Sequence, residues 1–263
     1  MVDFSATTPE ASSPDARGSG EFVLVGSAPT SALTDVTGFM ADVLAQPRFA
    51  SIPFRLIADH PIDSLQPLPE AVADAAGLSE RRDLLQLRRT LPIEVDHPAR
   101  STAPALAVRA FRIEVEQGQA DDIDGWIRVN NRAFAHHPDQ GRETRASLLG
   151  QIAEDWFDPA GFLVADDPAR PGELSGFCWT KVHPATDRDL ELGEIYVIGV
   201  DPSHAGEGLG ASFTLAGLDH LAGRGLANAM LFVDDDNDPA RRLYHRLGFT
   251  AHHRRRVYSA APA

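Results

Sequence analysis

A run of glycines directly after a predicted strand is the first feature of this sequence that could do chemistry. Residues 193–200 alternate and are rich in β-branched side chains, which predicts a strand that Asp201-Pro202 ends. Gly206, Gly208 and Gly210 follow and lead into an apolar helical pattern. Glycines let a backbone curl around an anion, and a helix N-terminus offers unpaired N–H groups, so this segment suits a phosphate-bearing ligand. It matches neither a Walker loop nor the dinucleotide fingerprint, and a tight turn that binds nothing is the alternative.

A second segment places a tyrosine on one face of a short helix. Residues 229–233 are predicted to form a strand, and Asn237 is a suitable N-cap for a helix with Pro239 in its first turn. Helical spacing puts Tyr244 on the apolar face, and Gly248 stands where a helix-ending glycine is expected. The apolar residues of that face are Ala240, Leu243 and Leu247. Tyr244 is therefore expected to point toward the sheet.

The elements that must position these residues follow an α/β order. Residues 1–20 have almost no large apolar side chain, which predicts a disordered tail. Residues 21–96 are predicted to form a partial domain, since they are too few for an independent α/β core. Residues 97–104 are polar and contain prolines, which indicates a linker. The second domain is expected over residues 105–263. The first segment predicts strands at 22–25, 54–57 and 84–87 and helices at 32–45 and 68–76. The second predicts strands at 107–113, 161–166, 174–183, 193–200, 229–234 and 254–259, and helices at 121–135, 143–154, 206–222 and 239–247. This order predicts a mixed α/β sheet.

Composition excludes several classes of protein. With 263 residues, 43% of them hydrophobic and 24% charged, the chain is expected to be globular. A formal net charge of −14 is the wrong sign for a general binder of nucleic acid or of anionic membranes. A single cysteine, an N-terminus without a secretory signal, and no apolar run of membrane-spanning length predict a soluble, cytoplasmic protein. We expect a monomer that acts on a small molecule.

No metal is expected. An EF-hand loop that began at Asp234 would have Pro239 where glycine is required and His245 where glutamate is required. The adjacent histidine pairs at 136–137 and 252–253 lack the spacing of zinc ligands. Cys178 lies in an apolar strand pattern, which favours a core residue over a nucleophile.

These segments together resemble the GNAT superfamily of N-acetyltransferases. Its acetyl-CoA loop has the form Q/R-x-x-G-x-G/A, and its next motif, N-x-x-A-x-x-L-Y-x-x-L-G-F, stands complete at residues 237–249. Within the superfamily the chain is similar to the mycothiol synthases, through residues 129–141, 156–159 and 176–184. The resemblance is strong over about residues 105–259, and it implies a GNAT acyltransferase fold with a complete C-terminal domain and a truncated N-terminal half-domain.

The resemblance implies the reaction and the residues that perform it. Acetyl would pass from acetyl-CoA to the cysteine amine of cysteinyl-glucosaminyl-inositol, or desacetylmycothiol, by direct attack and without a covalent acetyl-enzyme. Glu194 matches the proposed general base, and Tyr244 matches the group that protonates the departing thiolate. The residues implied to contact acetyl-CoA are Ile198, Gly199, Val200, Ala205, Gly206, Glu207, Gly208, Leu209, Gly210, Ala211, Asn237, Asp238, Pro239, Ala240, Arg241 and Arg242. Those implied to contact the acceptor are Asp139, Lys181, Glu194 and Phe232.

The sequence departs from the family pattern at several of these positions. Ala205 replaces a Gln or Arg, and Glu207 puts a carboxylate beside the expected pyrophosphate, which predicts weaker CoA binding. Asp139 is shorter than the usual Glu, and Phe232 replaces a Tyr that contacts substrate. Another amine, such as a peptide N-terminus or an amino sugar, is therefore an alternative acceptor, and a CoA-binding module without turnover is a further alternative. The segment 21–96 has no glycine loop and is expected to bind no CoA.

Overall fold

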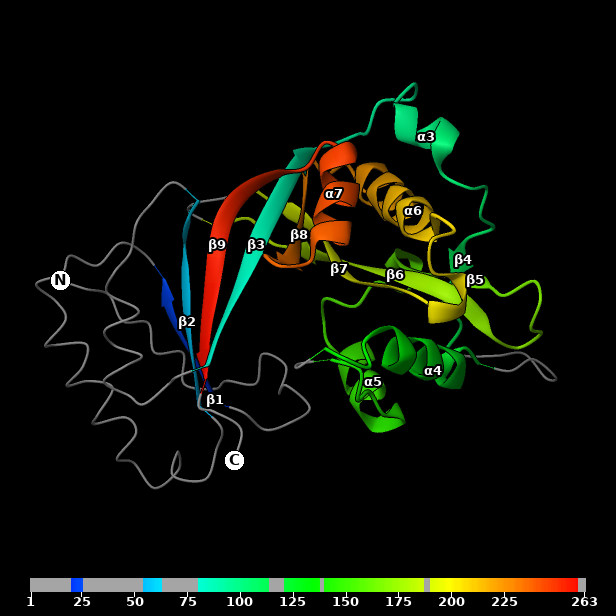
Figure 1. Cartoon of the computed structure of the whole chain (residues 1–263), viewed down its shortest axis with the longest axis horizontal. Helices are drawn as coiled ribbons and strands as arrows, with labels where there is room; N and C mark the ends of the chain where they lie inside the picture. Colours follow the sequence, from blue (N-terminus) through cyan, green and yellow to red (C-terminus); the bar gives the residue numbers. More distant parts are fainter. Residues whose placement is uncertain are drawn as a thin grey trace, which may run out of the picture. The chain divides into compact units, whose positions relative to one another are not determined.

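The computed structural model describes residues 20–25, 54–62, 80–113, 121–137, 140–186 and 190–259 (Figure 1). The chain divides into two compact units, each considered by itself below. Unit 1 comprises residues 1–87, 233–241 and 251–263, and unit 2 comprises residues 88–232 and 242–250. The predicted linker at 97–104 contains a short helix, α3 (Pro98–Thr102). The domain boundaries inferred from the sequence stay predictions.

The described part of unit 1 is built from strands. β1 (Gly20–Val25) pairs in parallel with β2 (Phe54–Pro61), and β2 pairs antiparallel with β9 (Thr250–Ser259). The order is β1-β2-β9-β3, in which β3 (Glu80–Thr90) is the longest strand. The helices predicted at 32–45 and 68–76 lie outside the described residues.

Unit 2 contains the sheet that carries the predicted site, in the order β8-β7-β6-β5-β4. β4 (Arg109–Ala110), β5 (Phe162–Asp166), β6 (Leu174–His183) and β7 (Leu192–Val200) are antiparallel neighbours, and β8 (Asn228–Asp234) is parallel to β7. The predicted mixed α/β sheet is confirmed. The strand expected at 107–113 is shorter than predicted, because only Arg109 and Ala110 pair with β5.

Helices cover both faces of this sheet. Figure 1 shows α4 (Ile123–Ala133) and α5 (Arg145–Ile152) on one side of β6 and β7, and α6 (Leu209–Gly223) on the other. α7 (Asp238–Arg246) follows β8. The short 3₁₀ turns η3 (Pro159–Gly161) and η4 (Pro202–His204) precede β5 and follow β7. No helix in the described ranges has the length and apolar run that crossing a membrane would require.

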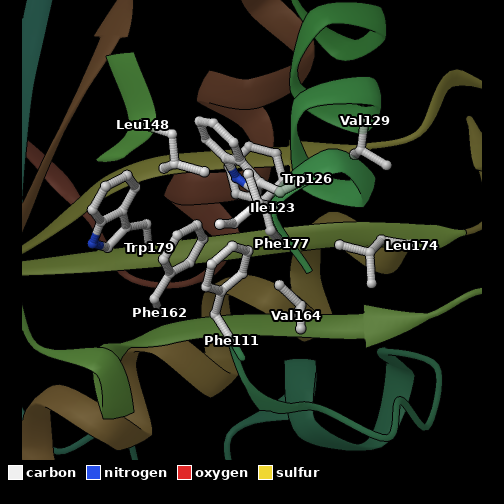
Figure 2. Close-up of a cluster of buried hydrophobic side chains, with 10 residues drawn as sticks. All are labelled: Phe111, Ile123, Trp126, Val129, Leu148, Phe162, Val164, Leu174, Phe177 and Trp179. Carbon is white, nitrogen blue, oxygen red and sulfur yellow. The ribbon is translucent and has the colours of Figure 1, made fainter. Parts of the chain in front are cut away.

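An aromatic cluster forms the core on the α4 side of the sheet (Figure 2). The Phe162 ring is stacked between two others, 4.1 Å from the Phe111 centroid and 4.3 Å from the Trp179 centroid. Trp126 of α4 meets Phe162 and Phe177 edge-on, at 5.7 and 5.4 Å. Edge-on and stacked aromatic pairs add to the free energy gained by burying their area, so this cluster fixes α4 on the sheet.

Phe162→Ala is expected to lower the free energy of unfolding by about 3–5 kcal/mol, because it leaves a cavity between two rings that cannot close on each other. Urea denaturation of the variant and the wild type measures the difference. Leu190→Ala is the matched control, since Leu190 is 77% exposed, and its effect is expected to stay within about 0.5 kcal/mol. Equal losses in both variants would contradict this account of the core.

Candidate functional site

β7 and β8 pair over only two residues and then separate. Gly193 pairs with Ala229 and Glu194 with Met230, and no later residues of these two strands pair with each other. β7 nevertheless continues to Val200 against β6. Because successive residues of a strand point their N–H groups to alternate sides, residues 195–200 present backbone donors and acceptors on the side that β8 has left. Ile198, Gly199 and Val200 lie in this part of β7.

An irregularity in the β6–β7 pairing accompanies this separation. Trp179 pairs with Val197 and Thr180 with Ile195, which leaves Tyr196 as an extra residue in β7. A bulge of this kind bends a strand and redirects its side chains. The Tyr196 ring lies 5.1 Å from Trp156 and 5.6 Å from Trp179, on the aromatic side of the sheet.

Glu194 occupies the last paired position of β7 before the strands part. Its residue is 7% exposed, and its Oε2 lies 2.7 Å from Nε2 of His183 on β6. Lys181 is directly opposite Glu194 in the antiparallel register. Directly opposite side chains share a face of the sheet, and His183 is two residues further along β6, so all three belong to one face.

The Lys181 ammonium lies over aromatic rings, 4.2 Å from the Trp156 centroid and 5.3 Å from that of Tyr196. Burial lowers the pKa of Lys181, and the negative charges of Glu194 and Glu154 oppose that shift in part. Ring faces stabilise a cation without removing its three hydrogen-bond donors. Lys181 can therefore donate to a hydroxyl-rich ligand beside Glu194.

Tyr244 is on the inner face of α7, as its position in the sequence predicts. Its residue is 6% exposed, and its ring lies 5.8 Å from that of Phe249. Burial, with a contribution from the Cys178 thiol, raises the pKa of Tyr244, so the phenol keeps its proton at neutral pH. Cys178 is fully buried with a pKa raised by desolvation to about 12, which agrees with the prediction of a core cysteine.

The glycine loop adopts a conformation that depends on glycine at two positions. Gly206 has φ +84° and Gly208 has φ +83°, values that L side chains rarely adopt. Gly208 is the N-cap of α6, so no side chain caps the first N–H groups of this helix. The helix begins at Leu209 and not at Gly206 as predicted, because the positive φ angles interrupt helical geometry before that point.

Charged groups hold the two ends of this loop. Burial disfavours the ionised form of Asp201, but hydrogen bonds from Ser203 and Arg170 outweigh this effect and lower its pKa to about 2. His204 lies between two carboxylates, with its Nε2 3.0 Å from Asp167 and its Nδ1 2.9 Å from Glu207. The bond to Asp167 and then the bond to Glu207 raise the pKa of His204. The carboxylate that the sequence places in the glycine loop therefore has a basic partner.

The second predicted CoA-binding segment is the start of α7. Asn237 caps the helix, since its Oδ1 accepts from the N–H of Ala240 at 3.2 Å. The Arg241 guanidinium lies 3.3 Å from Asp235 and 3.7 Å from Asp238. Asn237, Asp238, Pro239, Ala240 and Arg241 belong to unit 1, whereas Arg242 and the glycine loop belong to unit 2. That both segments contact one CoA molecule stays a prediction.

The structure brings some predicted site residues together and adds others. Glu194 and Lys181 share one face, and Phe232 is half-buried in β8, two residues after the last pair with β7. Asp139 lies outside the described residues. The segments 156–159 and 176–184, which carry the family resemblance, include Trp156 and His183, but the sequence assigns no role to either of them or to Tyr196. Two-residue spacing from Lys181 could have indicated His183, but the strand register needed to place it beside Glu194 is not readable from the sequence.

Comparison with known proteins identifies relatives of this arrangement. Residues 126–249 match the model of the Acetyltransferase (GNAT) family. A mycothiol acetyltransferase of Kocuria rhizophila is 44% identical over 189 residues, which is 72% of this chain and 60% of that protein. A mycothiol acetyltransferase of Acidimicrobium ferrooxidans is 48% identical over 180 residues, 68% of this chain and 54% of that protein. The chain thus spans a little over half the length of these curated relatives.

A solved structure shares the fold. The GCN5-related N-acetyltransferase from Sphaerobacter thermophilus has a TM-score of 0.58 and 19% identity, over 92% of this chain and 74% of that one. At this identity the likeness shows the fold alone. The expected GNAT fold is confirmed.

The ion pairs of His204 are expected to make stability depend on pH. Because the pKa of His204 is raised in the folded state, its contribution is complete below the unfolded value of 6.5 and is lost as pH rises through the folded value. The difference in unfolding free energy between wild type and His204→Gln should therefore be largest below pH 6.5 and shrink as the pH rises above this value. Urea titrations at several pH values measure it, and a difference that stays constant would contradict the assignment.

Proposed function

We propose that this chain, which belongs to the GNAT family of acetyltransferases, transfers acetyl from acetyl-CoA to the cysteine amine of cysteinyl-glucosaminyl-inositol, and so forms mycothiol. The observation that carries the proposal is the buried Glu194 at the point where β7 and β8 separate, opposite Lys181. The names of relatives at 44% and 48% identity support the acceptor. The comparison covers only part of those proteins, so the acceptor rests on the assay described below.

In the proposed reaction Glu194 removes the proton that prevents the amine from attacking. An α-amino group has a free pKa of about 8 and is mostly protonated at neutral pH. Glu194 accepts this proton directly or through one water, and the N–H bond breaks as the new O–H bond forms. The neutral amine then attacks the thioester carbonyl directly, since both substrates are held in one site and no acetyl-enzyme is needed.

Acetyl-CoA supplies the acetyl group as a thioester, and two parts of unit 2 suit its binding. Backbone N–H groups among Ile198, Gly199 and Val200 would hold the acetyl carbonyl and stabilise the negative charge that develops on its oxygen. The uncapped start of α6, with the loop 205–211, would hold the pyrophosphate through N–H groups and the positive end of the helix dipole. Residues 237–242 are a further predicted contact of CoA.

Tyr244 would protonate the sulfur of the departing CoA. A thiolate leaves more readily when a proton arrives as the carbon–sulfur bond breaks. The raised pKa of Tyr244, which burial causes, keeps the phenol protonated before this step. As the amide forms, the nitrogen loses its second proton, which restores the Tyr244 hydroxyl, and Glu194 releases the first proton to solvent to complete the cycle.

Lys181 would bind the hydroxyls of the acceptor beside Glu194. Its ammonium is oriented by Trp156 and Tyr196 and keeps its donors. Phe232 and Asp139 complete the predicted acceptor contacts, and both depart from the family pattern. An amine other than that of cysteinyl-glucosaminyl-inositol is therefore an outcome that the assay must be able to detect.

The proposal is tested by the release of free CoA and the mass of the product. Purified protein receives acetyl-CoA with cysteinyl-glucosaminyl-inositol, or with cysteine, glucosamine or a short peptide. Mass analysis accompanies the thiol assay because the acceptor carries a thiol of its own. Saturable formation of acetylated pseudodisaccharide, with little turnover of the other amines, is expected. Preference for another amine would replace the acceptor, and acetyl-CoA binding without any turnover would support a non-catalytic module.

Tyr244→Phe is expected to lower kcat by about 10²–10⁴-fold and to leave the affinity for CoA unchanged, because it removes only the transferred proton. Steady-state kinetics and calorimetric titration with CoA measure the two quantities. Tyr258→Phe is the matched control: it makes the same substitution at a buried residue of unit 1 and is expected to retain turnover. Wild-type turnover in Tyr244→Phe would remove the assignment.

Glu207→Gln is expected to tighten CoA binding about two- to fivefold, because a half-exposed carboxylate no longer repels the pyrophosphate. Glu207→Arg is expected to tighten it further. His204 compensates part of the charge, so the gain is small. Glu191→Gln removes a carboxylate before β7 and serves as the control. An unchanged CoA dissociation constant in Glu207→Arg would show that Glu207 does not face the pyrophosphate.

A further inference from the structure

The contact between His183 and Glu194 is not required by any role assigned above. The two nitrogen and oxygen atoms lie 2.7 Å apart, on side chains that are 36% and 9% exposed. A buried carboxylate loses favourable contacts with water, so each remaining hydrogen bond contributes more to stabilising its charge. Among the described residues, His183 is the one whose side chain bonds to the Glu194 carboxylate.

We propose that His183 is a positioning residue, which donates its Nε2–H to Oε2 of Glu194 and thereby leaves Oε1 to accept the proton of the substrate amine. This inference rests on the proposed function, since it assigns a partner to the base of that reaction. The proton balance is simple. The N–H bond of the ammonium breaks, an O–H bond forms on Glu194, and His183 keeps its own proton throughout.

A donor at Oε2 restricts the rotation of the carboxylate, so the same oxygen, Oε1, faces the amine in each turnover. A base that is already oriented loses less conformational freedom on reaching the transition state. The contact should therefore raise kcat and leave the affinity for acetyl-CoA unchanged.

The other groups around Glu194 do not replace this contact. Lys181 faces it from β6 and interacts with its charge, but the ammonium lies over the Trp156 and Tyr196 rings. Glu154, beyond the end of α5, interacts with Lys181. Ala229 and Met230 of β8 pair with this part of β7 and carry no charge. His183 is thus the hydrogen-bond donor to Glu194 on this face, and Lys181 is held by the rings.

The test compares two substitutions that differ only in the donor. His183→Leu removes the N–H, whereas His183→Gln keeps an amide N–H at a similar distance from the backbone and cannot titrate. His183→Leu is expected to lower kcat about 10- to 100-fold with little change in KM for acetyl-CoA, and His183→Gln is expected to recover most of the loss. His252→Leu removes an exposed histidine of unit 1 and is expected to behave as wild type.

Rescue by the conservative variant separates positioning from a merely structural role. A structural role of the ring would be lost in both variants, whereas positioning requires only the donor. The kcat of His183→Gln should therefore stay near the wild-type value while that of His183→Leu falls, with KM for acetyl-CoA little changed in both. Equal losses of kcat in the two variants would overturn the proposal.

Failure of this inference is distinguishable from failure of the proposed function. A large loss of kcat in Glu194→Gln, with kinetics of His183→Leu like those of the wild type, would overturn the role of His183 alone. Wild-type turnover in Glu194→Gln would overturn the base itself. If both residues act as one unit, Glu194→Gln combined with His183→Leu should be no slower than Glu194→Gln alone.

Discussion

The separation of β7 from β8 after Glu194 is the constraint on which the site depends. The two strands pair at Gly193 and Glu194 only, so the remainder of β7 has lost one row of backbone partners. On the face of the sheet away from α4, α6 packs so closely that a Cβ at Gly217 would lie 2.6 Å from the Cys178 sulfur and from Ile195. Unpaired backbone groups are costly unless water or a ligand satisfies them. A sheet that opens at this point therefore favours a ligand that can complete the missing row.

The aromatic core is in direct contact with the rings that hold Lys181 on the acceptor side of the site. Trp179 stacks on Phe162 in the core and also lies 5.6 Å from Trp156 and from Tyr196, the two rings beneath the Lys181 ammonium. Side chains in a close-packed interior transmit displacement to their neighbours. The position of Lys181 is thereby tied to the same cluster that holds α4 on the sheet.

The charged side chains around the glycine loop are paired with neighbouring groups of opposite charge. Glu207 would be an unfavourable charge beside a pyrophosphate, but His204 bonds to it and to the buried Asp167 at the same time. Arg170 and Arg132 hold Asp201 at the end of β7. The net charge of −14 therefore does not describe the local field at this loop.

Residue spacing is enough to predict the mixed sheet, the order of its strands in the chain and the inward position of Tyr244, because two-residue and helical periods are properties of the chain alone. Two glycines were recognised, but the start of α6 was placed at Gly206 because positive φ angles leave no pattern in the sequence. Tertiary packing sets the remaining contacts: Glu194 stands where two strands part, His183 bonds to it, and Trp156 lies under Lys181. These contacts join residues up to 36 positions apart, as Glu194 and Met230 are. They depend on strand register and on a bulge at Tyr196, which the sequence does not specify locally.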